Sequence, residues 1–200
     1  MPRRSAAEAR DTRARILDRA VAIAARDGLE GVTIGRLADD LEMSKAGVYG
    51  HFGSKEALQL ATFDAAVEQF RQLVPARVPR TATGIERLRH LCDAWIDYLE
   101  HGGIAEGGCF LTAAATEFDG RPGPVRDAVA QAAGRWLAYL EQLATAAVET
   151  GDLPPDTDPA QIAFELNGIA MSANQAIQLQ RDDAAPQRAR RAMHRAAGGL

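Results

Sequence analysis

The sequence has few of the residues on which many kinds of functional site depend. Two cysteines and four histidines occur among 200 residues, and their spacing matches neither a disulfide framework nor a zinc site. There is no apolar run of the roughly 18 residues that a membrane span requires. The basic N-terminus lacks the apolar stretch of a secretory signal. We therefore expect a cytoplasmic protein that needs neither a metal nor a cofactor.

The sequence also lacks a pattern that indicates catalysis. Its carboxylates are scattered, and no nucleophile lies at a regular spacing from a general base. Glu117 and Asp119 lie close together, but they are explained more simply as the end of a helix. We therefore expect a protein that is not an enzyme.

Positive charge is scarce overall and unevenly distributed. The net charge is −4, which by itself argues against a nucleic-acid partner. Residues 1–60 carry ten Arg and Lys against nine Asp and Glu, a net of +1, whereas residues 61–200 carry 13 against 18, a net of −5. Both lysines, Lys45 and Lys55, lie in the first part. Because phosphate binding depends on where charges lie, this asymmetry directs attention to the N-terminal region.

Apolar residues recur at helical spacing nearly throughout, and no segment alternates as a strand does. We expect an all-α protein with a three-helix DNA-binding domain in residues 1–56 and a helical bundle in residues 57–200. Capping boxes are predicted for Ser5 with Glu8 and for Thr83 with Glu86. The predicted inward face is Leu17, Ala20, Val21 and Ala24 in the first helix, and Ile85, Leu88, Cys92, Trp95 and Leu99 in the helix after Thr83.

The segment TIGRLADDLEMSKAGVYGHFGSK, which starts at Thr33, is the most informative part of the chain. Thr33, Ser44 and Ser54 each precede a helical pattern, as N-caps do, and a tight turn separates the first two helices. Such a unit can present its second helix to the major groove of DNA. Val48 and Phe52 are four residues apart and are predicted to face inward. The small and polar residues between them are then left outside.

The second helix of this unit has features that suit contact with DNA. Gly47 and Gly50 each cost about 1 kcal/mol relative to alanine inside a helix, and close approach to a duplex would explain them. Ser44 and Ser54 begin helices whose free N–H groups favour an anion, and a lysine follows each directly. Taken singly, each feature is more simply a cap or a solvated side chain. The combination favours DNA binding.

This helix-turn-helix with the following string YGHFGSKEAL resembles the DNA-binding domain of TetR-family transcriptional regulators over roughly residues 12–66. The resemblance implies phosphate contacts and base-reading positions along the segment. The phosphate contacts would be Thr33, Tyr49 and Lys55, with Ser44 as the cap, and the base-reading positions Lys45, Ala46, Gly47, Gly50 and His51, with Gly35 where some members have arginine.

Two residues depart from the family pattern. Glu42 lies in the turn where the family often has glycine, which predicts a strained or altered turn. Gly50 lies where a larger side chain is common, so base reading is expected to depend more on Lys45 and on groove shape. The later segment GGCFLTAAATEFDGRPGPVRD resembles, more weakly, the ligand-binding domain of one subgroup of the family.

The family resemblance also implies a homodimer and an effector pocket in the second domain. Residues 125–150 and 159–180 are the expected dimer helices, although the same surface would also suit packing within one subunit. Pocket candidates are Trp95, Tyr98, Cys109, Phe110, Trp136, Tyr139, Phe164 and Met171. Aromatic residues at helical spacing are more often plain core. Cys109 follows two glycines at a helix start, which would lower its thiol pKa, and both a redox switch and a buried structural cysteine are open readings.

The hypothesis is a ligand-responsive, sequence-specific transcriptional regulator, most simply a repressor that a small molecule releases from its operator. Its partners would be double-stranded operator DNA, an unknown small-molecule effector and a second copy of the chain. One alternative is a helical module that binds a small molecule or a protein without operator binding. Another is a helical enzyme with a coincidental helix-turn-helix, which nothing in the sequence favours.

Overall fold

The computed structural model describes residues 6–101, 103–104 and 107–198, and within them the chain is helical without a strand, which confirms the all-α prediction. The helices are α1 (Ala6–Asp27), α2 (Ile34–Asp40), α3 (Lys45–Phe52), α4 (Lys55–Leu73), α5 (Gly84–Glu100), α6 (Phe110–Phe118), α7 (Pro124–Glu149), α8 (Pro159–Gln178) and α9 (Ala185–Ala196), with short 3-10 turns η1 (Leu29–Gly31) and η2 (Pro75–Arg77). None of the described helices is long and apolar enough to cross a membrane.

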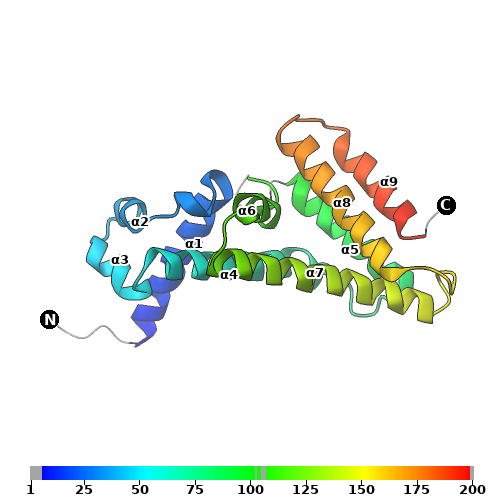
Figure 1. The fold of residues 1–200 in the computed structure, drawn as a ribbon, viewed down its shortest axis with the longest axis horizontal. Helices are drawn as coiled ribbons and strands as arrows, with labels where there is room; N and C mark the ends of the chain where they lie inside the picture. Colours follow the sequence, from blue (N-terminus) through cyan, green and yellow to red (C-terminus); the bar gives the residue numbers. More distant parts are fainter. Residues whose placement is uncertain (1–5, 102, 105–106, 199–200) are drawn as a thin grey trace.

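The helices are arranged in an elongated molecule (Figure 1). α1, α2 and α3 gather at one end, and α5, α8 and α9 lie at the other. α4 and α7 run along the length between the two ends, and the short α6 lies above them near the middle. The two long helices therefore connect the N-terminal unit mechanically to the C-terminal bundle.

The buried apolar residues form two clusters, and both long helices contribute to each. The first core joins α1 to α4 with α6 and the first half of α7, through residues such as Ile16, Phe63 and Val129. The second core joins the end of α4 to α5, α8, α9 and the second half of α7. The boundary proposed at residue 56 stays a prediction, because the first core includes residues from both sides of it.

The predicted caps are confirmed in part. Thr33, Ser44, Ser54 and Asp158 each accept a hydrogen bond from a backbone N–H of the first turn that they precede. Ser5 lies outside the described residues. The predicted Thr83–Glu86 capping box is wrong, because the Thr83 side chain makes no cap hydrogen bond.

A distant carboxylate caps α5 instead. Asp152 Oδ2 accepts from the N–H of Ile85 (3.1 Å) and from the hydroxyl of Thr150 (2.7 Å). These hydrogen bonds, Thr150 first, lower the pKa of Asp152. The cap comes from the loop between α7 and α8, so no local spacing could have predicted it.

One other expectation is refined by the fold, and the last helix is held in place by ion pairs. Ile16 is fully buried in α1 and Leu17 is only half-buried, so the inward face is rotated slightly from the predicted one. The basic last helix is held against α5, because Arg190 pairs with Asp97 and Glu100 while Met193 is fully buried.

Candidate nucleic-acid interface and effector cavity

The turn between α2 and α3 is built from local hydrogen bonds and one strained residue. The N–H of Arg36 donates to Thr33 Oγ1 (3.2 Å), and that of Gly47 donates to Ser44 Oγ (3.0 Å). Glu42 has a φ of 53°, in the left-handed region that favours glycine. Glu42 thus adopts a left-handed backbone conformation at some conformational cost, as the expectation of a strained turn implied.

The outer face of α3 is open, as a recognition helix requires. Val48 is fully buried and fixes the helix, while Lys45, Ala46 and Gly50 are exposed and Tyr49 is 54% exposed. A Cβ built on Gly50 would meet no atom within 4 Å. Packing within the chain therefore does not require glycine at this position.

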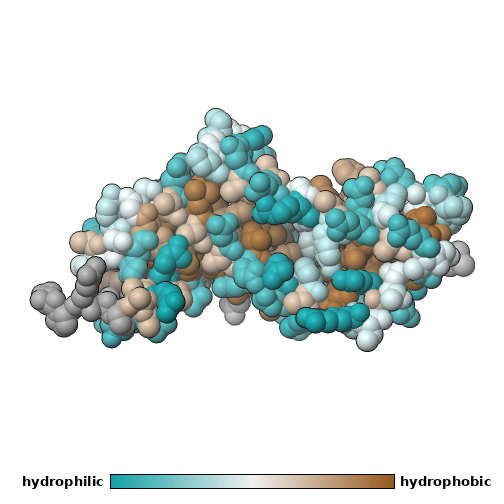
Figure 2. Space-filling view, turned by 90° about the horizontal axis from the view of Figure 1, so that it is seen from below, coloured by the Kyte–Doolittle hydropathy of each residue, from teal (hydrophilic) through white to brown (hydrophobic). Residues whose placement is uncertain are grey.

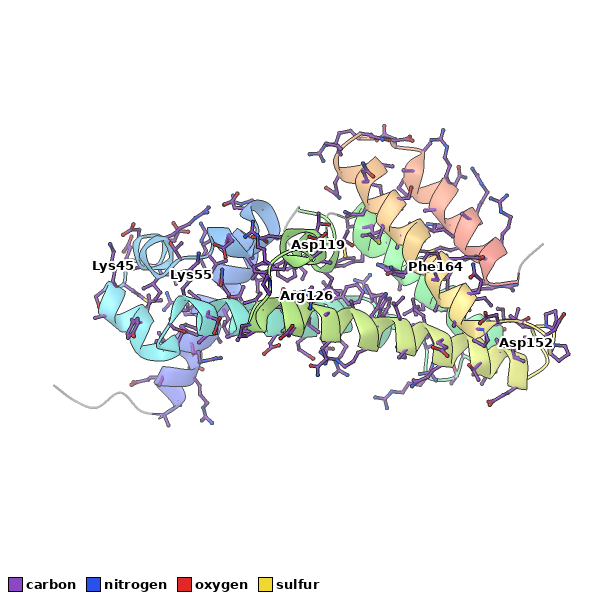
Figure 3. All side chains as sticks on the ribbon, in the orientation of Figure 1. Lys45, Lys55, Asp119, Arg126, Asp152 and Phe164 are labelled. Carbon is purple, nitrogen blue, oxygen red and sulfur yellow. The ribbon has the colours of Figure 1, made fainter. Side chains whose placement is uncertain are left out.

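The cationic side chains around the helix-turn-helix differ in whether they form ion pairs. Within α2 and α3, Arg36 pairs with Asp27 (2.6 Å), whereas Lys45 has no ion-pair partner. Lys55 Nζ lies 2.8 Å from Glu30 Oε2, and the hydrogen bond from Lys55, followed by that from Gln59, lowers the pKa of Glu30. Lys45 and Lys55 lie at the same end of the molecule (Figure 3). A phosphate that Lys55 contacts would therefore compete with Glu30 for its ammonium group.

Other residues named from the sequence also lie around α3. Gly35 on α2 faces Lys45, since a Cβ there would lie 3.6 Å from Lys45 Cε. His51 is half-buried, and its ring centroid lies 6.3 Å from that of Phe52. Phe52 is half-buried beneath the guanidinium of Arg13, 5.0 Å from its ring centroid. The predicted DNA-contacting residues are thus adjacent in space as well as in sequence.

An apolar cavity of about 100 Å³ lies where the two cores meet. Its walls include Phe63 and Val129 of the first core and Phe70, Trp95 and Cys109 of the second. The remaining lining residues are Leu111, Thr112, Ala115, Ala132, Ala133, Trp136, Leu137, Asn167 and Met171. Its lining is mostly apolar with a few polar groups, which is the chemistry typical of a small-molecule site.

Three aromatic rings dominate one side of this cavity. Trp95 and Trp136 pack edge to face with ring centroids 4.7 Å apart, and Phe70 lies 5.0 Å from Trp136 in the same manner. The indole N–H groups of Trp95 and Trp136 are buried without a hydrogen-bond partner. Leaving a buried donor unpaired costs about 1–3 kcal/mol.

A wider groove of about 670 Å³ adjoins the cavity and shares Phe70, Leu111, Ala132 and Trp136 with it. The rest of its lining comes from the end of α4, the segment around η2, the start of α5 and the middle of α7. Those residues are Val67, Arg71, Gln72, Pro75, Ala76, Arg80, Arg87, Arg135 and Tyr139. No sequence pattern predicted this groove, because its arginines are far apart along the chain.

Helix α6 connects the cavity to the DNA-binding end. Leu111, Thr112 and Ala115 on α6 line the cavity. One turn further on, the Glu117 carboxylate accepts hydrogen bonds from the N–H groups of Leu29 (2.8 Å) and Glu30 (2.9 Å) in η1. The sequence identified Glu117 only as a helix end, and its partners are 87 and 88 residues away.

Comparison with known proteins agrees with this geometry. Residues 16–62 match the model of bacterial regulatory proteins of the tetR family, and residues 84–193 match the tetracyclin repressor-like C-terminal domain. The chain belongs to the TetR family of transcriptional regulators. It is therefore a DNA-binding regulator with an N-terminal helix-turn-helix.

Individual TetR-family relatives agree over most of the chain. HTH-type transcriptional regulator SrpR of Pseudomonas putida is 30% identical over 161 residues, which are 79% of this chain and 71% of SrpR. A TetR regulator from Chloroflexus aurantiacus has the same fold, with a TM-score of 0.87 at 22% identity, covering 94% of this chain and 95% of that one. AibR, solved with isovaleryl coenzyme A and operator DNA, gives a TM-score of 0.69 at 23% identity, covering 90% and 95%.

The cavity includes four of the pocket residues proposed from the sequence, namely Trp95, Cys109, Trp136 and Met171. Tyr139 lines the adjoining groove, and Tyr98 packs on Phe70 but lines a separate hollow. The prediction that Phe110 lines the pocket is wrong, because Phe110 is buried in the first core against Phe63. The same prediction for Phe164 is also wrong, because it is 71% exposed on α8 (Figure 3). Helical periodicity cannot distinguish a cavity wall from a core or an outer face.

The expected lowering of the Cys109 pKa is wrong. Cys109 is buried, and burial raises the pKa of its thiol despite hydrogen bonds around Thr112. Burial likewise raises the pKa of Cys92 to about 12. Both thiols are free and buried, which is the environment of structural rather than reactive cysteines.

Proposed function

We propose that this TetR-family regulator is a repressor that binds its operator as a homodimer and leaves it when a small molecule occupies the cavity. The observation that carries the proposal is the double role of α6. One face of α6 lines the cavity, and its last turn holds η1 through Glu117. η1 lies directly before α2, so a displacement of α6 reaches the helix-turn-helix.

The release mechanism would be a population shift. An effector that fits the cavity better in one arrangement of α6 favours that arrangement. If that arrangement changes the separation of the two α3 helices in a dimer, they no longer match half-sites about 34 Å apart or a multiple of that distance. Operator affinity then falls by the ratio of effector affinities for the two arrangements.

The exposed apolar residues of α7 and α8 support the homodimer. Phe164, Met171 and Leu137 are large apolar side chains that remain exposed on these two helices. Gly168 and Ser172 on α8 are small residues that allow close approach of a second helix. A single helix-turn-helix reads only a few base pairs, so a two-fold pair is what sequence-specific binding requires.

Within the DNA complex, we assign base reading and phosphate binding to different residues. Lys45 is exposed at the start of α3, where recognition helices contact base edges, and it forms no ion pair with any residue that the structure describes. Thr33, Tyr49 and Lys55 flank it and would contact phosphates, Lys55 after exchanging Glu30 for a phosphate oxygen. AibR was solved with isovaleryl coenzyme A and operator DNA. That structure supports the proposal that this fold binds both an effector and DNA.

Fluorescence anisotropy with labelled DNA from immediately upstream of the protein's own gene tests this proposal. We expect binding below micromolar concentration that selects a palindromic site and weakens steeply with salt, because several phosphates are neutralised. Binding that ignores sequence, or no binding below micromolar, would contradict the proposal and favour a helical module without an operator.

A further inference from the structure

The groove beside the cavity carries more positive charge than a passage to an apolar space requires. Arg80, Arg87 and Arg135 line it and form no ion pair with any described residue. Arg71 also lines it and pairs with Glu68 at 3.0 Å. Among the described lining residues of the groove there is no aspartate or glutamate.

These arginines are brought together by the fold. Arg71 lies on α4, Arg80 after η2, Arg87 on α5 and Arg135 on α7. Their convergence is notable in a chain whose net charge is −4. Unpaired cations that converge from separate elements repel one another unless an anion joins them.

The groove is distant from the helices that contact DNA. Arg71 follows Lys55 by 16 positions within α4, which places it about 24 Å further along the helix axis. Figure 2 views the molecule from below, where α4 and α7 lie in Figure 1, and shows hydrophobic residues reaching the surface among hydrophilic ones. Both chemistries needed for an amphiphilic ligand are therefore present away from the DNA end.

The adjoining cavity limits the apolar part of such a ligand. Its volume of about 100 Å³ is smaller than the roughly 150 Å³ of an engineered cavity that holds benzene. A ligand group that enters it must therefore be short and apolar.

We propose that the effector is an organic anion with at least two negative charges, whose short alkyl or acyl group enters the cavity and whose phosphate lies on Arg80, Arg87 and Arg135. Arginine suits phosphate because its planar guanidinium donates two parallel hydrogen bonds. This inference rests on the proposed function for the cavity and names its ligand class.

Calorimetric titration of the full-length protein without DNA tests the inference. The probes all carry a four-carbon alkyl or acyl group and differ in charge. We expect n-butyl phosphate to bind at least tenfold more tightly than butyrate, and butyrate more tightly than 1-butanol. Butyryl coenzyme A and butyryl pantetheine, which lacks the nucleotide phosphates, form a second pair with the same expected order. A larger advantage for the coenzyme A thioester identifies a nucleotide-linked acyl group as the source, and equal advantages identify a small phosphate ester.

Paired variants locate the anion. Arg87→Gln with Arg135→Gln should reduce the affinity for both phosphate-bearing probes at least tenfold and leave that for butyryl pantetheine unchanged. Arg126→Gln, on α7 outside the groove and paired with Asp127, is the matched control and should change neither. Equal binding of charged and uncharged probes, no binding of either phosphate-bearing probe at millimolar concentration, or an unaffected double variant would overturn the inference. Anion-selective binding that leaves operator affinity unchanged would contradict the release mechanism alone.

Discussion

The two apolar cores of this regulator differ in how they are built and in what they serve. The first core packs helices that are neighbours in sequence, α1 to α4, and adds α6 and the start of α7 from the second half of the chain. The second core packs α5, α7, α8 and α9 into a bundle. The first core thus fixes helix α3 of the helix-turn-helix, and it does so partly with elements from the C-terminal domain.

The cavity lies between the cores, with Phe63 and Val129 from one and Trp95 and Cys109 from the other. A molecule placed there contacts both cores at once. Because close-packed interiors shift between discrete arrangements rather than deform continuously, a small displacement at this junction can change the pose of the whole N-terminal unit. Substitutions at this junction should therefore change DNA affinity even though the substituted residues do not contact DNA.

The largest effect is expected on the bundle side, at the exposed face of α8. Phe164→Asp should convert the proposed dimer to a monomer, because a charge replaces a large apolar side chain at the proposed interface. Operator affinity should fall roughly 100-fold or more, since the second half-site no longer benefits from linkage to the first. Analytical ultracentrifugation and anisotropy measure the two effects. A variant that stays dimeric with unchanged operator affinity would show that this face is not the interface.

At the DNA end, two lysines should differ in the kind of effect they produce. Lys45→Ala should cost about 1–3 kcal/mol of operator binding and relax preference at the bases it contacts. Lys55→Ala should weaken all sequences about equally and reduce the salt slope by about 1. Titrations against a set of single-base operator variants at several salt concentrations measure both. Indistinguishable results for the two variants would refute the assignment of roles.

A pair of glycines separates the needs of folding from those of DNA binding. Gly50→Ala should raise the free energy of unfolding by about 0.5–1 kcal/mol, because the added Cβ meets no described atom within 4 Å. It should nevertheless weaken operator binding, because the same Cβ stands where the duplex would approach. Gly53 has equal space but a φ of 76°, so Gly53→Ala should lower the free energy of unfolding by about 1 kcal/mol. Denaturant unfolding provides both values. Unimpaired operator binding by Gly50→Ala would mean that the duplex does not approach this position.

The smallest effect on DNA binding is expected from thiol chemistry. Burial raises the pKa of Cys92 to about 12 and raises that of Cys109 as well, so at pH 8 both thiols are protonated and unreactive. A thiol-specific chromogenic reagent should modify neither residue in the native protein and both after unfolding. Rapid native modification of Cys109 that changes operator affinity would restore the redox interpretation.

How much of this molecule the sequence could predict depends on the distance over which each feature is specified. The caps at Thr33 and Ser44 and the inward Val48 are set by neighbours within one helical turn, and the structure confirms them. By contrast, Asp152 accepts a hydrogen bond from the start of α5, 67 residues away, and Glu117 accepts one from η1, 88 residues away. Nothing in local spacing encodes such pairs, so they emerged only from the fold.

The cavity shows the same limit for side chains of one type. Trp95, Trp136 and Phe164 are all pocket candidates in the sequence because they are large aromatic residues, yet two line the cavity and the third is on the outside. Which side of a helix is covered depends on neighbouring helices, and for Phe164 on a second subunit if the proposed dimer forms. The groove arginines carried no signal at all, because single exposed arginines are ordinary in any helical protein.

The junction between the cores can be tested most directly by filling it from within. Ala115 on α6 lines the cavity, whereas Ala113 on the same helix is exposed. Ala115→Leu should occupy the cavity as an effector would and lower operator affinity at least tenfold in anisotropy titrations, with helical content retained. Ala113→Leu should bind the operator as the unmodified protein does. If Ala115→Leu folds and binds the operator as tightly as Ala113→Leu, the cavity does not control the DNA-reading end.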